Sequence, residues 1–198
     1  MDKTPTKERI LDSALTLFSE KGYDGVGVDL IAENAGIKGP SLYKHFKGKE
    51  DILDSLIEKA EKYYEEKFGS ADAPGDIPST MEELIELSLK RTRFTLCDPM
   101  IKKVRKMLTM EQFRSRSIAV LATKYNMGIV QGIYRRVFQA MMDKEIIRKS
   151  DPELLSLSFI APITLLIQLC DREPEREQEA IKRIEDYFRF FAEEYKVR

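Results

Sequence analysis

Apolar residues recur at helical spacing along almost the whole chain of 198 residues, and no stretch alternates apolar and polar residues as a half-buried strand does. In the first run, Ile10, Leu11, Ala14 and Phe18 share one helical face until Gly22 interrupts the pattern. The same spacing returns after each later interruption by glycine or proline. We therefore predict an all-α fold of about nine helices.

Residues that favour helix ends divide the chain further. Thr4 before Pro5 is typical of a helix start, Ser79 and Glu82 have the spacing of a capping box, and Asp151 precedes another helix. Residues 69–78 are rich in Gly, Pro, Ser and Asp, which indicates a linker. The expected helices cover residues 5–21, 28–35, 40–46, 49–68, 79–97, 99–114 and 117–144, and two more begin at 152 and 174.

Charged and metal-binding residues exclude several classes of protein. Lys and Arg total 33 against 34 Asp and Glu, so binding to nucleic acid needs a local patch and cannot rest on bulk charge. The single His excludes sites built from two histidines, and Cys97 and Cys170 are too few for a zinc knuckle or a disulfide framework. With no nucleophile–base pair and no phosphate-binding loop, we expect no enzyme, no catalytic residue, no metal and no cofactor.

The segment 154–170 carries no charged residue, which raises the question of a membrane span. It is shorter than the roughly 20 apolar residues that a span needs, and it contains Ser, Thr, Gln and Pro. A helix that is apolar all round in a soluble chain is typically buried on two sides. We therefore predict core and subunit interface here, no membrane contact, and a cytoplasmic protein with a charged N-terminus.

Residues 26–53 have the sequence form of a helix-turn-helix, in which two short helices are joined by a tight turn with a central glycine. Gly36 can adopt the positive φ that a sharp turn needs, and Ala32 and Ala35 are small enough for the helices to cross closely. Leu42 is spaced to fill the wedge between them. The second helix would then lie in the major groove of DNA.

The charge pattern supports this interpretation. The first 50 residues carry as many acidic as basic side chains, yet Lys38, Lys44, Lys47 and Lys49 follow Gly36 with no acidic residue among them. A basic run in a neutral domain is typical of an edge that faces phosphates. The alternative is a solvated face on which lysines happen to cluster.

Part of this segment resembles the TetR family of bacterial transcriptional repressors. The family hallmark is an A-G-V/I turn, a recognition helix ending in L-Y-x-H-F, and K-E-x-L opening the next helix; the chain reads AGIKGPSLYKHFKGKEDIL. The resemblance covers about residues 7–53, and beyond it only length, helical pattern and an uncharged penultimate helix agree. It implies a three-helix DNA-binding domain over 1–48 and a helical ligand-binding and dimerisation domain over 49–198.

Carried over position by position, the resemblance implies contacts with double-stranded DNA. Lys and Ser can read base edges, and Tyr, His and helix N-termini bind phosphate oxygens. Gly27 and Lys38 depart from the family, which usually has a capping Thr and a capping Ser there, so both caps are expected to be weak. The implied DNA-binding residues are Lys38, Gly39, Ser41 and Lys44 for base edges, Tyr43, His45 and Lys49 for phosphates, and Pro40.

The C-terminal part carries more apolar surface than one small bundle can cover. The helix from Pro152 and the apolar stripe of the last helix would bury this surface as a four-helix bundle across a two-fold axis. The alternative is that the same side chains face their own core. The predicted homodimer interface consists of Phe159, Ile163, Ile167, Ile184, Phe188 and Phe191.

Met and aromatic residues gather in the helices that would surround a cavity. Such adaptable side chains suit an apolar pocket, although plain core packing gives the same pattern. No pair of buried carboxylates and no basic cluster indicates a charged effector. The candidate ligand-binding residues are Met107, Met110, Phe113, Tyr125, Met127 and Gln168, and the expected ligand is a small apolar molecule.

Together these features predict a repressor that binds a palindromic operator as a homodimer and leaves it when a small effector binds. The two heads would reach successive major grooves, about 34–36 Å apart. An effector that prefers a conformer with mismatched heads would weaken DNA binding, and the helix from residue 49 is the expected lever. Two alternatives stay open: an activator of the same fold, and a protein-interaction adaptor without operator binding.

Overall fold

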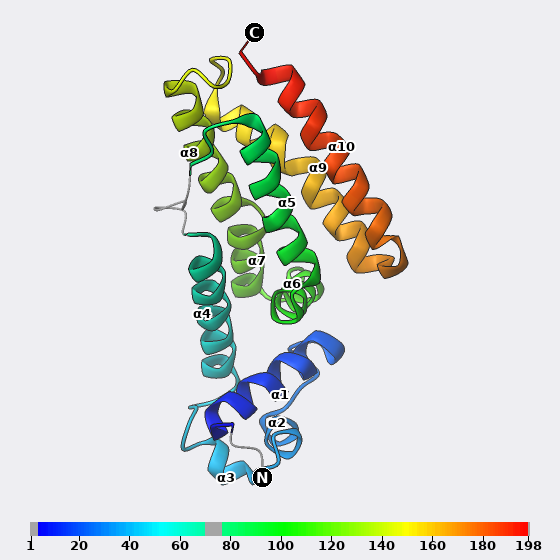
Figure 1. Ribbon diagram of the computed structural model, residues 1–198. Helices are drawn as coiled ribbons and strands as arrows, with labels where there is room; N and C mark the ends of the chain where they lie inside the picture. The colour runs from blue at the N-terminus through cyan, green and yellow to red at the C-terminus, as the bar shows by residue number, and fades with distance from the viewer. Residues whose placement is uncertain (1–3, 70–76, 198) are drawn as a thin grey trace. The chain divides into compact units, whose positions relative to one another are not determined.

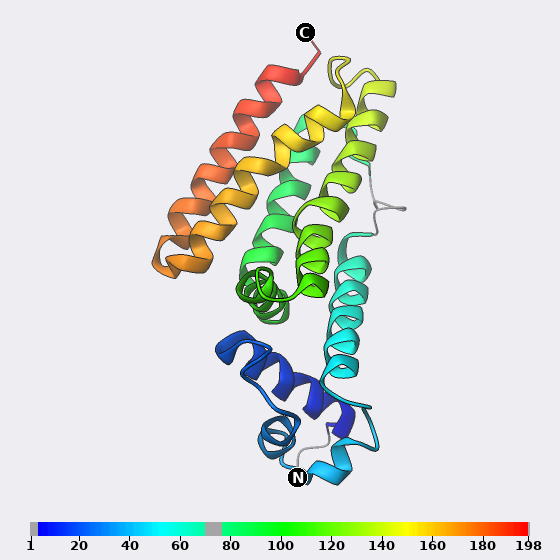
Figure 2. The same ribbon diagram turned by 180° about the vertical axis from the view of Figure 1, so that it is seen from behind.

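The computed structural model describes residues 4–69 and 77–197, and these form an all-α protein, as predicted (Figures 1 and 2). Within these residues the one β-type contact is an isolated bridge between Ile147 and Lys196. The central part of the predicted linker, 70–76, lies outside the described residues. The α-helices are α1 (Thr6–Lys21), α2 (Val28–Asn34), α3 (Gly39–Leu42), α4 (Lys49–Phe68), α5 (Met81–Cys97), α6 (Pro99–Glu111), α7 (Arg116–Thr123), α8 (Ile129–Asp143), α9 (Pro152–Arg172) and α10 (Glu177–Tyr195).

The start of α5 is fixed by a capping box one residue later than predicted. Thr80 is the N-cap and accepts the backbone N–H of Glu83 at 3.1 Å, while Glu83 accepts the N–H of Ser79 at 2.6 Å. The predicted pairing of Ser79 with Glu82 is therefore wrong. Two capping residues and two glutamates stand side by side in the sequence, and only the backbone geometry selects the pair.

The helix predicted over 117–144 is interrupted by a π-helical turn. Residues Lys124–Gly128 form this turn and join α7 to α8 with helical backbone on both sides. A π turn holds one more residue than an α turn, so it changes which side chains continue the buried face. After α8, Glu145 adopts a φ of 57° and donates its N–H to the Met142 carbonyl at 3.0 Å, which closes the helix in a left-handed conformation.

The chain divides into two compact units, and each is described by itself. The first unit comprises residues up to 64 together with 99–122, and the second comprises 65–98 together with the chain from 123 onward. This division follows contacts within the chain. The functional boundary predicted between residues 48 and 49 stays a prediction.

In the first unit, α1 packs on α2 and α6, and α2 packs on α3. Each of the first four helices contributes a fully buried apolar side chain: Phe18, Ile31, Leu42 and Ile52. Burial of each such side chain contributes about 1.5–3 kcal/mol to the stability of the domain. It also fixes which faces of α2 and α3 point outward.

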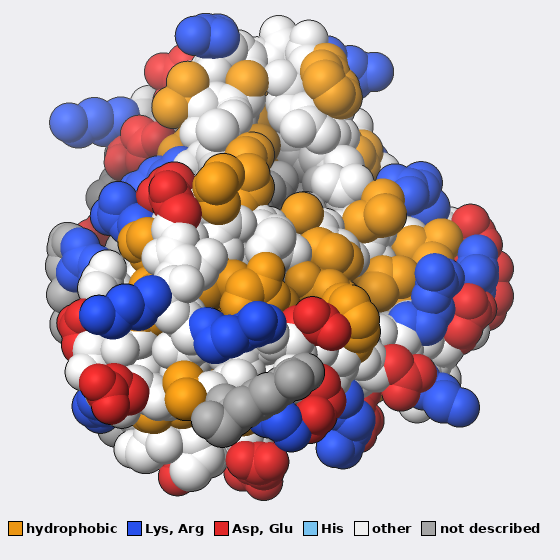
Figure 3. Space-filling model, turned by 90° about the horizontal axis from the view of Figure 1, so that it is seen from above, with side chains coloured by type: hydrophobic (Ala, Val, Ile, Leu, Met, Phe, Trp, Pro, Cys, Tyr) orange, Lys and Arg blue, Asp and Glu red, His pale blue; other side chains and the backbone are white. Residues whose placement is uncertain are grey.

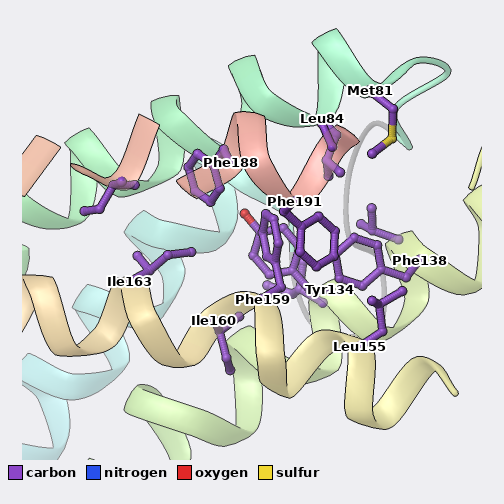
Figure 4. Close-up of a cluster of buried hydrophobic side chains, with 14 of the residues drawn as sticks. Met81, Leu84, Tyr134, Phe138, Leu155, Phe159, Ile160, Ile163, Phe188 and Phe191 are labelled. Atoms are coloured by element: carbon purple, nitrogen blue, oxygen red, sulfur yellow. The ribbon is translucent and has the colours of Figure 1, made fainter. Parts of the chain in front are cut away.

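Aromatic rings fill the core of the second unit (Figure 4). The ring centroid of Phe159 on α9 lies 4.7 Å from those of Tyr134 and Phe191 and 5.0 Å from that of Phe188. Rings at such separations attract each other beyond the effect of buried area. This cluster joins α9 to α8 and α10.

The uncharged helix α9 begins as predicted. The Asp151 carboxylate accepts the backbone N–H groups of Glu153 and Leu154 at 2.8 and 3.1 Å. By length and composition alone α9 could cross a membrane, a test that core helices of soluble proteins also pass. In the structure it packs against α8 and α10, which is the core position predicted for it.

The side chains predicted for the dimer contact lie in the core of their own chain. A side chain that is buried within its own protomer cannot also face a partner. The structure therefore supports the alternative, in which these residues face their own core. Ile167 is half-buried, and the buried residues are Phe159, Ile163, Ile184, Phe188 and Phe191.

Other large apolar side chains on the same two helices are exposed. Leu165 on α9 and Phe190 on α10 are 62% and 63% exposed, and Leu154 and Leu157 are also open to solvent. Seen from the end that carries the C-terminus, hydrophobic side chains reach the surface between charged ones (Figure 3). These helices thus retain apolar surface that their own chain does not cover.

Candidate nucleic-acid interface

The turn between α2 and α3 depends on Gly36, which has a φ of 66°. Only glycine adopts this left-handed conformation readily. The N–H of Gly36 donates to the Glu33 carbonyl, and that of Ile37 donates to the Ala32 carbonyl, both at 3.0 Å. Ala32 and Ala35 are buried. The predicted turn is therefore confirmed.

Two buried side chains determine which face of α3 points outward. Leu42 and Phe46 are buried, as predicted, and the N–H of His45 donates to the Leu42 carbonyl at 2.9 Å in the turn that follows α3. The predicted DNA contacts lie around these anchors and are open to solvent to different degrees. Gly39 and Ser41 are half-buried, and the exposed residues are Lys38, Pro40, Tyr43, Lys44 and His45.

Lys49 differs from the other predicted contacts. Its ammonium group donates to the Tyr23 carbonyl at 2.9 Å and lies 4.2 Å from the centre of the Tyr23 ring. Burial, followed by the charges of Glu50, Asp24 and Asp54, raises the pKa of Tyr23. In this structure Lys49 therefore holds α4 to the loop after α1, and it must leave Tyr23 to reach a phosphate.

Two carboxylates join the lysine-rich segment from outside the window 36–49. Asp51 accepts the backbone N–H of Lys47 at 2.8 Å. Asp29, in the first turn of α2, places Oδ1 3.1 Å from the position that a Cβ on Gly39 would take. Sequence reasoning missed both, because the packing of α2 on α3 and the first turn of α4 bring them in.

An ion-pair cluster braces α1 against α4. The Lys59 ammonium group bonds the Glu8 carboxylate and lies 3.5 Å from a carboxylate oxygen of Asp12. Burial lowers the pKa of Lys59, but the hydrogen bond to Glu8 and the charges of Asp12 and Glu8 outweigh burial and raise it. Lys7 also lies over the Phe46 ring at 5.5 Å. These contacts fix the helices that support the interface.

The N-termini of α2 and α3 have the weak caps that the sequence predicts. Gly27 and Lys38 are the N-cap residues, and neither helix has a side-chain hydrogen bond to its cap. The first N–H groups of α2 therefore remain available to anions, whereas in α3 only the Gly39 N–H does, because Pro40 has none and the Ser41 N–H donates to the Lys38 carbonyl at 2.8 Å.

The candidate ligand residues fall into both units. Met107 is buried on α6, Met110 is partly exposed, and Phe113 is 91% exposed. In the second unit Tyr125 is half-buried, while Met127 and Gln168 are exposed. A cavity of about 460 Å³ in that unit has none of them in its wall; its lining is Gln139, Met142, Asp143, Glu145, Lys149 and Ser150.

A buried polar cluster in the second unit was not predicted. The Arg91 guanidinium donates to the Phe68 carbonyl at 3.0 Å and lies 5.8 Å from the ring centres of Phe68 and Tyr134. The buried Tyr134 hydroxyl donates to Ser88 Oγ at 3.0 Å, and burial raises the pKa of Tyr134. Helical periodicity gives no signal for such a cluster, because polar residues usually mark the solvent face.

Known proteins resemble the N-terminal segment in sequence. A family model described as bacterial regulatory proteins of the tetR family matches residues 10–56. The biofilm operon icaADBC HTH-type negative transcriptional regulator IcaR of Staphylococcus epidermidis is 47% identical over 58 residues, which are 29% of this chain and 31% of IcaR. IcaR of Staphylococcus aureus strain Newman is 51% identical over 51 residues, 26% of this chain and 27% of that protein. The match thus spans about a third of these curated relatives.

Solved structures share the fold over nearly the whole chain. A TetR-family transcriptional regulator from Mesorhizobium loti has a TM-score of 0.74 at 18% identity and covers 97% of both chains. SmeT, the repressor of the Stenotrophomonas maltophilia multidrug efflux pump SmeDEF, has a TM-score of 0.73 at 19% identity, with coverage of 100% of this chain and 93% of SmeT. At these identities the likeness shows the fold alone.

Proposed function

Because the chain is a TetR-family transcriptional regulator by its N-terminal segment and its fold, we propose that it is a cytoplasmic repressor that binds a palindromic operator as a homodimer and is released by a small effector. The observation that carries the proposal is the outward face around α3. There Lys38, Tyr43, Lys44 and His45 are exposed beside the buried anchor Leu42. These side chains match the donors that base edges and phosphates require.

The roles divide by chemistry. Lys38, Ser41 and Lys44 face the base edges. Lys donates hydrogen bonds to guanine O6 and N7, and the Ser hydroxyl can donate to or accept from any base. Tyr43 and His45 donate to phosphate oxygens. Pro40 and Gly39 let the backbone approach the groove, and Lys49 adds a phosphate contact once its ammonium group leaves Tyr23.

We place the dimer contact on the exposed apolar residues of α9 and α10. Leu154, Leu157 and Leu165 project from α9, and Phe190 projects from α10. Two copies of these helices would form a four-helix bundle and remove this surface from water. The helices are those predicted from the sequence, while the side chains in contact are different ones.

The effector is a small, largely apolar molecule. A solved structure of SmeT, a protein of the same fold, is a complex with triclosan. In this chain Ser88, Arg91 and Tyr134 supply polar groups within an aromatic core, which suits one polar substituent on an apolar body. The residues kept as candidate contacts are Met107, Met110, Phe113, Tyr125, Met127 and Gln168.

Release from DNA follows from differential binding. An effector that binds more tightly to a conformer whose heads do not fit successive major grooves weakens operator binding by the ratio of its two affinities. The helix α4 belongs to both units, with residues 49–64 in the first and 65–68 in the second. We therefore propose α4 as the lever.

Fluorescence anisotropy tests the proposal. The purified protein is titrated with DNA from upstream of its own gene and with a scrambled duplex, each at two salt concentrations. We expect tight binding that prefers the upstream fragment and weakens steeply with salt, because lysines displace counterions from phosphates. Equal and weak binding to both duplexes would contradict self-regulation and favour a protein-interaction adaptor of the same fold. Tight, specific binding that raises transcription of the gene would favour an activator.

A further inference from the structure

The carboxylate of Asp29 stands where the recognition helix lacks a side chain. Asp29 belongs to α2, which packs on α3 (Figures 1 and 2). Its Oδ1 lies 3.1 Å from the position of a Cβ on Gly39, the first residue of α3. Gly39 holds a position that the family resemblance assigns to base readout, yet it has no side chain to read with. The nearest side-chain oxygen at that position comes from Asp29.

This carboxylate is free to bind a ligand. Asp29 is exposed, and within residues 4–69 and 77–197 it makes no hydrogen bond and no ion pair. A carboxylate in the first turn of a helix also interacts favourably with the helix dipole. However, Oδ1 of Asp29 lies 3.1 Å from the Cβ position of Gly39 on the next helix, and within the described residues it accepts no N–H of α2. Hydrogen bonding to α2 therefore does not account for its position.

A lone carboxylate is an unfavourable neighbour for DNA unless it meets a donor. Lys38, Lys44 and Lys47 of the same segment are exposed and suit phosphates, whereas a carboxylate repels phosphates. An ionised carboxylate only accepts hydrogen bonds. In the major groove the donors are the amino groups of cytosine and adenine, and Asp pairs best with cytosine N4.

Resting on the proposed function, we infer that Asp29 is a specificity-determining residue that accepts a hydrogen bond from cytosine N4 at the base pair beneath Gly39. Gly39 is suited to this role because a Cβ there would crowd the carboxylate and force it to shift by a few tenths of an ångström. The same carboxylate repels guanine O6 and thymine O4, so it selects for cytosine and against the other two bases. Asp29 thus supplies the readout that Gly39 cannot.

Selection from a random DNA library tests this inference with the full-length protein. Wild type, Asp29→Ala and Asp29→Asn are compared, and Glu33→Gln is the matched control because it removes an exposed negative charge from the same helix. We expect a cytosine at one position of each half-site for wild type and for Glu33→Gln. Asp29→Ala is expected to lose about tenfold of the preference for it, and Asp29→Asn to shift the preference toward adenine, whose N6 and N7 an amide pairs with. Affinity of Asp29→Ala for scrambled DNA should rise.

The outcomes separate this inference from the proposed function. If Asp29→Ala and Asp29→Asn select the wild-type consensus and merely bind all DNA more tightly, the carboxylate acts by charge alone and the inference is overturned. If wild type enriches a palindrome without a cytosine that depends on residue 29, the inference is overturned while operator binding stands. If wild type enriches no sequence at all, the proposed function itself fails. Asp29→Asn has the shape of the native side chain, so it decides the matter if the alanine variant does not fold.

Discussion

Replacing Glu111 with Met is expected to stabilise the protein. The Glu111 side chain is 0% exposed at the end of α6, and in the described part of the chain neither carboxylate oxygen has a hydrogen-bond partner. Its ion pair with Arg114 spans 3.7 Å to a side chain that is 69% exposed. The carboxylate occupies the space where a Cβ on Gly22 would lie, after the end of α1. A charge is thus buried against two helix C-termini, where the helix dipoles disfavour it.

The size of the effect follows from this arrangement. A buried charge without hydrogen bonds costs several kcal/mol, while an ion pair with an exposed partner returns about 0–1 kcal/mol. Met is close to Glu in length and carries no charge. We therefore expect the free energy of unfolding to rise by about 1–3 kcal/mol. For a chain of this size each kcal/mol raises Tm by about 2–4 °C.

Urea titration followed by circular dichroism, together with calorimetry, measures this change. Glu111→Gln should gain less than Glu111→Met, because it keeps a buried polar group. Glu20→Met is the control, since Glu20 is an exposed glutamate in the same unit, and it should change the free energy of unfolding by less than about 0.5 kcal/mol. The prediction is refuted if Glu111→Met lowers the free energy of unfolding while Glu20→Met leaves it unchanged. That result would mean that stabilising contacts hold the Glu111 carboxylate.

Three further changes test other parts of the structure. Glu145 has a φ of 57°, a conformation that glycine adopts with less strain, so Glu145→Gly should raise the free energy of unfolding by about 0.5–1 kcal/mol. Urea titration measures this change. A lower free energy of unfolding would show that contacts of the Glu145 side chain contribute more than the backbone strain costs. Leu165→Arg places a charge on the exposed apolar face of α9, and sedimentation velocity should then show a shift from dimer to monomer. A dimer that persists at the same concentration would contradict the proposed contact. Tyr134→Phe removes the donor to Ser88 and should cost about 1 kcal/mol at neutral pH. Burial raises the pKa of Tyr134 above its ordinary value, so wild type keeps this contribution below about pH 10 and loses it as pH rises through the folded pKa. The Phe variant should not lose stability in this way at alkaline pH. If the free energy of unfolding fell equally with pH in both proteins, the raised pKa of Tyr134 would not be its cause.

Features that depend on neighbours in the sequence could be predicted. The turn at Gly36 and the cap at Asp151 each depend on residues two to five positions apart, and both are confirmed. The same reasoning placed α5 one residue early, because Ser79 and Thr80 are equally good caps by composition. The local sequence therefore indicates that a helix begins at this point, but only the backbone geometry shows which residue is the N-cap.

The exposed face of α9 could not be predicted. Phe159 and Ile163 are buried, whereas Leu157 and Leu165 are exposed, although all four are large and apolar. The segment 154–170 of this helix has no charged residue, so no charged stripe marks the side that faces solvent. The packing of α9 against its neighbours, mainly α8 and α10, determines which of its side chains stay exposed.

Contacts between residues far apart in the chain also required the structure. Lys49 bonds the carbonyl of Tyr23 and is therefore not a free phosphate contact here, and Asp29 on α2 lies beside Gly39 on α3. Composition counts the charges of a segment but not the partners that packing brings to them. The sequence thus predicted the turn at Gly36 and the buried anchors around α3 better than it predicted how the charges there are arranged.

The most direct test of operator recognition by α3 compares affinity for a selected operator with affinity for scrambled DNA, at one fixed salt concentration. Wild type is measured beside Lys44→Ala and beside Lys182→Ala, which removes an exposed lysine from α10. We predict that wild type prefers the operator by at least about 10³, that Lys44→Ala reduces this preference about tenfold, and that Lys182→Ala leaves it unchanged. Equal affinity of wild type for both duplexes, or an unchanged preference in Lys44→Ala, would contradict the account.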